Sequence, residues 1–127
     1  METNLTIQQV AVLTHLSEHT LRYYERIGLL DAVNRASSGH RRYSVQDMAW
    51  IEFLTRLRTT GMPIRKMQQF AALRRQGDPT VAERRRLLEV HRQEVQSKLD
   101  ELQDNLSEIE QKIQHYKTLE LNHEVSI

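Results

Sequence analysis

One long segment limits the fold of this 127-residue chain more than any other feature. Residues 80–127 contain neither glycine nor proline, and hydrophobic residues recur in them with a seven-residue period. This pattern predicts a single helix from about residue 80 to residue 120, on the order of 60 Å long. A lone polar helix of that length is not stable, so its apolar face needs a partner. The residues predicted to form that face are Leu88, Val95, Leu99, Leu102, Leu106, Ile109, Ile113 and Tyr116.

Two partners are conceivable for this face: a second copy of the chain, or the chain's own N-terminal domain. The helix is much longer than a 77-residue domain is wide, which favours a two-stranded antiparallel coiled coil between two copies. Arg85 and Arg92 interrupt the apolar pattern near the start, so that part is expected to pack differently. Gly77, Asp78 and Pro79 mark the boundary, and Thr80 is the predicted cap of the long helix. The expected domains are therefore 1–77, a dimerisation helix over 78–120 and a short tail over 121–127.

Two short helices are predicted at the start of the N-terminal domain. Thr6 is followed three residues later by a glutamine, the pattern of a capping box, and Ser17 is a second cap. The helix that follows Ser17 is expected to stop at Gly28. Two short helices joined by a turn of a few residues indicate a helix-turn-helix motif.

A small hairpin and two further helices complete this domain. Residues 29–43 are too broken for a helix, and Gly39 suits the turn of a hairpin, or wing. Ser44 opens a second capping box, and Pro63 suits the first turn of the next helix. The predicted fold is mostly α: a winged helix-turn-helix head followed by a long coiled-coil helix.

Charge is unevenly distributed along the chain. Residues 1–77 carry 11 lysines and arginines against 6 acidic residues, a net charge of +5, whereas residues 78–127 carry 7 against 11, a net of −4. A basic head on an acidic extension is typical of a DNA-binding domain joined to a non-binding segment. Mean hydropathy is −0.64 and no membrane-length apolar run or signal peptide is evident, so a cytoplasmic protein with no membrane partner is expected.

Nothing in the sequence favours catalysis. There is no glycine-rich phosphate loop and no nucleophile with an evident base, so we expect no enzyme activity and no cofactor. The chain contains no cysteine, which excludes disulfides and thiolate metal sites within it. His15 and His19 are four residues apart but straddle a turn and lack a third ligand, so no metal site is expected.

The candidate DNA contacts come from the second helix and the wing. Arg22 and Tyr23 are expected on the exposed side of that helix, although a solvated arginine and a packing tyrosine are the alternative. Arginines of the wing would reach phosphates. The predicted DNA-binding residues are Ser17, His19, Thr20, Arg22, Tyr23, Arg35, His40, Arg41, Arg42 and Tyr43.

The segment Thr20–Leu30, followed by residues 34–35, 39–43 and 57–64, closely resembles the DNA-binding head of the MerR-type transcription regulators. This resemblance implies a homodimer that binds a near-palindromic promoter operator and distorts the DNA, thereby acting indirectly on RNA polymerase. The stretch Ile51–Pro63 is most similar to the aldehyde- and nitrosothiol-stress branch. Members of that branch often carry a cysteine where Arg56 stands here, so sensing through a thiol is not expected.

Two other function classes stay open from the sequence. A small-molecule binding module could use an apolar pocket around Trp50, Phe53 and Phe70, although these residues could equally be core. A coiled-coil adaptor is the third class, but the charge asymmetry and the wing arginines count against it. The effector is unknown, and control by protein concentration without an effector is the other option.

Overall fold

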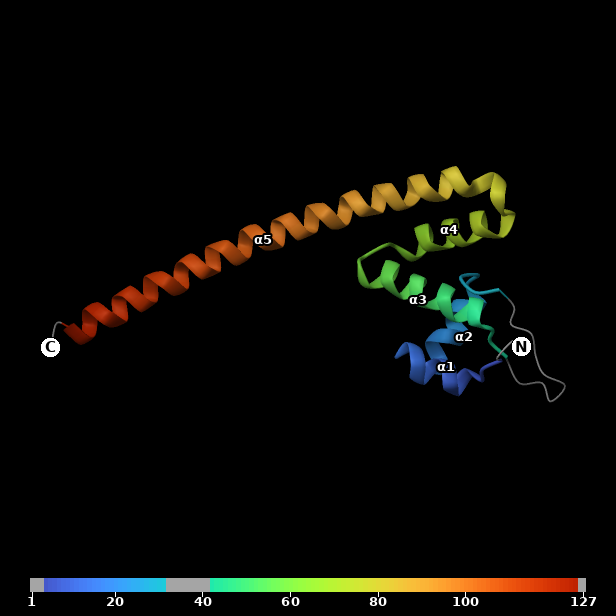
Figure 1. The fold of residues 1–127 in the computed structure, drawn as a ribbon, viewed down its shortest axis with the longest axis horizontal. Coiled ribbons are helices and arrows are strands. Elements are labelled where there is room, and N and C mark those ends of the chain that lie inside the picture. Colours follow the sequence, from blue (N-terminus) through green and yellow to red (C-terminus); the bar gives the residue numbers. More distant parts are fainter. Residues whose placement is uncertain (1–3, 32–41, 126–127) are drawn as a thin grey trace. The chain divides into compact units, whose positions relative to one another are not determined.

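The computed structural model describes residues 4–31 and 42–125, and these residues form five α-helices and one 3-10 turn (Figure 1). The chain divides into two compact units, Met1–Leu88 and Glu89–Ile127. The elements, in chain order, are α1 (Ile7–Thr14), α2 (Glu18–Arg26), α3 (Val45–Thr59), α4 (Ile64–Gln76), the 3-10 turn η1 (Asp78–Thr80) and α5 (Val81–Val125).

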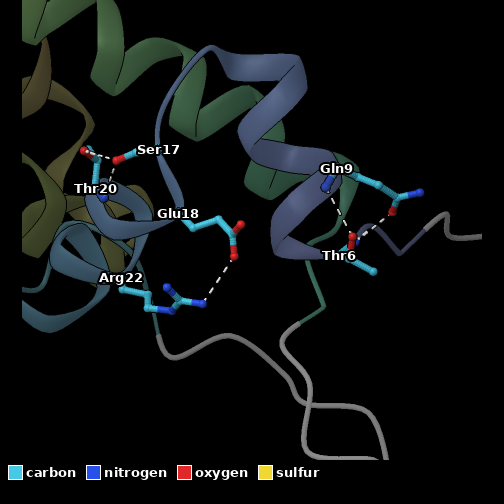
Figure 2. A network of polar contacts seen from close by, with 6 residues as sticks. All are labelled: Thr6, Gln9, Ser17, Glu18, Thr20 and Arg22. Atoms are coloured by element: carbon cyan, nitrogen blue, oxygen red, sulfur yellow. Dashed lines mark hydrogen bonds and ion pairs between the residues drawn. The ribbon is translucent and has the colours of Figure 1, made fainter.

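The predicted helix caps at Thr6, Ser17 and Ser44 are confirmed. The Thr6 hydroxyl accepts a hydrogen bond from the Gln9 backbone N–H, and the Gln9 side chain accepts one from the Thr6 backbone N–H (Figure 2). Ser44 and Asp47 form the same reciprocal pair at the start of α3. These bonds satisfy backbone donors that the first turn of a helix leaves without a partner, and so they fix where each helix begins.

The helix-turn-helix is built around two residues with positive φ. His15 ends α1 at φ 60°, a left-handed conformation that non-glycine residues seldom adopt. Gly28 follows α2 at φ 86°, where a side chain would be strained. Val10 of α1 and Leu21 of α2 are fully buried, so both short helices contribute to the same core.

The core of the Met1–Leu88 unit draws on all four short helices and on the segments beside them. Its buried members are Ile7, Val10, Leu21, Tyr24, Leu29, Leu30, Tyr43, Trp50, Ile51, Leu54, Leu57, Met62, Met67, Phe70 and Ala71. Trp50 stacks on Phe70 with ring centroids 5.9 Å apart, and its indole N–H donates to the Leu29 carbonyl over 2.8 Å. That bond ties α3 to the segment that follows α2.

An isolated antiparallel bridge closes the base of the head. Leu5 and Tyr43 exchange two backbone hydrogen bonds of 2.8 Å each. The Tyr43 side chain is 0% exposed. The ring of Tyr43 therefore fills the core, and its predicted contact with DNA stays a prediction. The turn of the predicted hairpin around Gly39 lies outside the described residues.

The junction between α4 and α5 differs from the sequence-based expectation. Thr80 was expected to cap α5, but its hydroxyl donates to the carbonyls of Leu73 and Gly77, 2.6 and 2.8 Å away. It also accepts a hydrogen bond from Nε of Arg84. Thr80 is buried and belongs to η1, so it fastens the end of α4 rather than starting α5.

The long helix α5 runs from Val81 to Val125 without a break. The expected end near residue 120 was too early, because the segment after it carries no glycine or proline to stop the helix. Leu87 and Leu88 pack against the core of the first unit. Within residues 4–31 and 42–125, no helix is apolar over enough of its length to cross a membrane.

We predict that Trp50→Phe lowers the free energy of unfolding by about 1–3 kcal/mol, because the buried Leu29 carbonyl loses its donor. Urea unfolding followed by circular dichroism measures the change. Tyr23→Phe, which removes a hydroxyl from a ring 37% exposed, is the control and is expected to stay within about 0.5 kcal/mol of the unsubstituted protein. Equal stability of the two variants would contradict the structural role of the indole bond.

Candidate nucleic-acid interface

Helix α2 has one buried face and one exposed face. Leu21 and Tyr24 point into the core, whereas His19, Arg22 and Tyr23 are exposed, as the sequence pattern predicts for a recognition helix. A helix of this width fits the major groove of B-DNA. Arg26 is exposed as well, so this face offers two guanidiniums, one imidazole and one phenol to a groove or to phosphates.

On this face, the side chains of Arg22 and Tyr23 already have partners within the helix. Nη2 of Arg22 lies 3.3 Å from Oε1 of Glu18, one turn earlier (Figure 2). The guanidinium of Arg26 lies over the Tyr23 ring, 5.6 Å from its centroid. These contacts hold Arg22 and Tyr23 along the helix surface in the absence of DNA.

Ser17 and Thr20 have a structural task at the start of α2. The Ser17 hydroxyl accepts a hydrogen bond from the Thr20 backbone N–H over 3.0 Å and donates one to the Thr20 hydroxyl over 2.9 Å (Figure 2). Both residues were predicted to contact DNA. The structure shows that their hydroxyls set the first residue of α2.

Tyr24 anchors the opposite face of α2. Burial raises the pKa of its phenol above the ordinary value of 10.0, an effect that the positive charge of Arg58 partly offsets and the neighbouring Tyr23 reinforces. The phenol is therefore neutral at physiological pH. The stability that depends on its neutral form is present there and is lost only as the pH rises through this raised pKa.

Side chains from α3 and α4 hold the end of α2. Trp50 donates to the Leu29 carbonyl, as described above, and Nε2 of Gln68 donates to the Ile27 carbonyl over 2.9 Å. Arg75 donates through Nη2 to the Gly28 carbonyl and through Nε to Asp31, the latter over 2.6 Å. Sequence reasoning missed Gln68 and Arg75, because a bond across more than 40 residues leaves no local signal.

Of the arginines and the histidine predicted for the wing, the structure describes only Arg42. Arg35, His40 and Arg41 lie outside the described residues. Arg42 is half-buried, next to Tyr43 at the base of the head. Among the described residues, Arg42 is the predicted wing residue whose side chain is partly exposed to solvent.

The residues predicted to form an effector pocket pack against one another. The rings of Trp50, Phe53 and Phe70 have centroids 5.7–6.1 Å apart, and the Arg74 guanidinium lies 4.3 Å from the Trp50 centroid. This is the arrangement of a core cluster with a cation on its outer ring. A separate open groove of about 450 Å³ is lined by Leu13, Thr14, Glu52, Thr55, Arg56, Thr59 and Thr60.

The residues predicted for dimerisation fall into two groups. Leu88 packs on the core of the Met1–Leu88 unit, and Val95 is half-buried. The others lie exposed on α5 in the single chain; for example, Leu102 is 66% and Leu106 is 54% exposed. The exposed members of the predicted seam are Leu99, Leu102, Leu106, Ile109, Ile113 and Tyr116.

Comparison with known families identifies this arrangement. Residues 5–73 match the model described as MerR HTH family regulatory protein, and residues 48–112 match the model described as MerR, DNA binding. The chain belongs to the MerR family. The two matches together include α1 to α4 and much of α5, so the MerR assignment rests on the helix-turn-helix and on the long helix alike.

Individual relatives agree with the assignment. The chain is 41% identical to the HTH-type transcriptional regulator AdhR of Bacillus subtilis over 72% of this chain and 65% of that protein. A MerR family regulator from Listeria monocytogenes has a similar structure, with a TM-score of 0.85, 35% identity and coverage of 90% and 86% of the two chains. HiNmlR, a MerR family regulator lacking the sensor domain and bound to promoter DNA, gives a TM-score of 0.83 at 33% identity, over 91% and 92% of the chains.

We predict that Ser17→Ala lowers the free energy of unfolding by about 0.5–2 kcal/mol, because the first turn of α2 loses its side-chain acceptor. Ser17→Asp supplies an equivalent acceptor and is expected to keep the stability of the unsubstituted protein. Thermal or urea unfolding measures both variants. If Ser17→Ala unfolds at the same urea concentration as Ser17→Asp, the capping role is refuted.

Proposed function

We propose that this MerR-family chain is a homodimeric transcription regulator that binds promoter DNA through α2 and the adjacent wing. The observation that carries the proposal is the two-sided character of α2, with Leu21 and Tyr24 in the core and Arg22 exposed beside Tyr23. The likeness to HiNmlR, which is bound to promoter DNA, supports the same use of this head. The proposed place of action is the cytoplasm, where a bacterial promoter is found.

In the proposed complex, α2 enters the major groove and the wing lies against the adjacent backbone. Arg22 and Tyr23 read base edges or bind phosphates, with His19 beside them. Arg42 and the predicted wing residues Arg35, His40 and Arg41 bind phosphates. Ser17, Thr20 and Tyr43 act indirectly, because their side chains hold α2 and the base of the wing in place.

The second part of the proposal is an antiparallel coiled coil of two α5 helices. An exposed stripe of large apolar residues along one helix is unusual in a stable monomer and marks an interaction surface. The seven-residue period of Leu99, Leu106 and Ile113, alternating with Leu102, Ile109 and Tyr116, is that of a two-stranded coiled coil. Two heads on one rod would then bind two halves of a near-palindromic operator.

The third part concerns output. Binding two half-sites from a fixed distance allows the dimer to bend and untwist the DNA between them, and such deformation carries an energy that depends on sequence. The proposed consequence is a changed alignment of the promoter elements that RNA polymerase reads. The activity is thus binding and deformation of DNA rather than catalysis.

We predict that Arg22→Ala weakens binding to the selected operator by about 5- to 150-fold, or about 1–3 kcal/mol, without a change in melting temperature beyond a few degrees. Fluorescence anisotropy with a labelled duplex obtained by in-vitro selection measures the affinity. Arg86→Ala, which removes an exposed arginine of α5 outside the apolar seam, is the matched control and is expected to bind like the unsubstituted protein. An Arg22→Ala protein that binds as tightly as the control would remove α2 from the proposed interface.

We predict that the protein sediments as a dimer at micromolar concentration and that Leu102→Lys with Leu106→Lys makes it a monomer. Burying lysine ammonium groups at the seam is expected to cost several kcal/mol per dimer. Ser107→Lys with Gln111→Lys introduces the same charges at the same spacing but off the seam, and is expected to remain dimeric. Analytical ultracentrifugation decides the matter, and a monomeric unsubstituted protein would overturn this part of the proposal.

A further inference from the structure

Gly77 lies between α4 and the turn η1 and has a backbone conformation that is open mainly to glycine. Its φ is 79° and its ψ is −149°. Glycine also samples other conformations at little cost, so a junction built on it alone would let the segments on either side turn relative to one another. The contacts around Gly77 therefore decide whether the first turn of α5 keeps one orientation on α4.

Two side chains that follow Gly77 bind the backbone at the end of α4. The hydroxyl of Thr80, a residue only 3% exposed, donates to the Leu73 carbonyl over 2.6 Å. Arg84 is half-buried in the first turn of α5. Its Nη2 donates to the Gly77 carbonyl over 3.0 Å, and its Nε donates to the Thr80 hydroxyl over 3.1 Å. One guanidinium thus binds both the glycine and the threonine that fastens α4.

The same last turn of α4 also holds the end of α2. Leu73, which accepts from Thr80, and Arg75 both lie in this turn. Arg75 donates to the Gly28 carbonyl and to Asp31, just after α2. Hydrogen bonds and one helical turn therefore connect the first turn of α5 to the end of α2, and all of these residues lie in the Met1–Leu88 unit.

Apolar packing alone does not fix this orientation. Leu87 and Leu88 also keep the start of α5 on the core, but hydrophobic contact is non-directional. A planar guanidinium instead requires its two acceptors at defined positions. In the proposed dimer, both α2 helices must meet their half-sites at once. A head that turns freely loses that freedom when the second half-site is bound, and this loss weakens binding.

We propose that Arg84 is a positioning residue that holds the first turn of α5 on the end of α4, so that each head of the dimer presents α2 in one direction. The inference rests on the proposed function, in which a dimer binds two half-sites through α2. Arg84 acts through Gly77 and Thr80 rather than by touching DNA. Its loss is therefore expected to weaken binding to a complete operator but not to a single half-site.

The test compares Arg84→Ala with Arg86→Ala, which removes the same charge from an exposed position on α5. Each protein is titrated against a labelled duplex enriched by in-vitro selection, and against the same duplex with one half-site replaced by random sequence. Arg84→Ala is expected to bind the full site about 3- to 10-fold more weakly than Arg86→Ala does. On the half-site duplex the two variants are expected to differ by less than about twofold, because each head is intact.

A second pair of variants breaks the same contacts without a change of charge. Thr80→Val removes the hydroxyl and keeps the branched shape, whereas Thr80→Ser keeps the hydroxyl. Thr80→Val is expected to lose full-site affinity as Arg84→Ala does, and Thr80→Ser is expected to retain it. With one base pair inserted between the half-sites, Arg84→Ala is expected to lose less affinity than Arg86→Ala, because a head that turns can follow the displaced half-site.

The outcomes separate the inference from the proposed function. An Arg84→Ala protein that keeps the full-site affinity of Arg86→Ala overturns the inference while the proposed function stands. Equal losses on the two duplexes overturn it as well, because Arg84 would then act within a single head, as a phosphate contact or in folding. An unsubstituted protein that binds neither duplex, or binds both equally, would overturn the proposed two-site binding and the inference with it.

Discussion

The position of α2 depends on three backbone carbonyls that side chains from other helices satisfy. The carbonyls of Ile27, Gly28 and Leu29 receive donors from Gln68, Arg75 and Trp50 respectively. Carbonyl groups at the end of a helix have no partner inside it, and leaving such a group buried without a donor is costly. Because two of the donors come from α4 and one from α3, the direction of the recognition helix is set by the whole head rather than by the turn that precedes it.

Local features of the fold could be predicted from the sequence because their causes are local. Thr6, Ser17 and Ser44 mark helix starts since the residue three positions later provides the matching backbone or side-chain group. The division of α2 into buried and exposed faces follows from the spacing of Leu21 and Tyr24. The head-plus-long-helix architecture was predictable for the same reason, because a glycine-free periodic segment has few other conformations open to it.

Features that depend on distant contacts could not be predicted in this way. Tyr43 follows two arginines and has the composition of a surface contact, yet its pairing with Leu5 carries it into the core. Thr80 has the sequence context of a cap, but its hydroxyl donates to the Leu73 carbonyl and accepts from Nε of Arg84 instead. Of the candidate site, Arg22 and Tyr23 were placed correctly on an exposed face, whereas the partners of Arg22 and of the α2 carboxyl end required three-dimensional geometry.

The recognition helix has nine residues and only two buried anchors, so it is too short to persist outside the head. Its surface therefore exists only while Leu21, Tyr24 and the surrounding core remain packed. A genetic screen for variants that no longer occupy the operator would accordingly return core positions as readily as positions that touch DNA. Every recovered variant would then need a measurement of folding, because both an unfolded head and a lost DNA contact abolish binding.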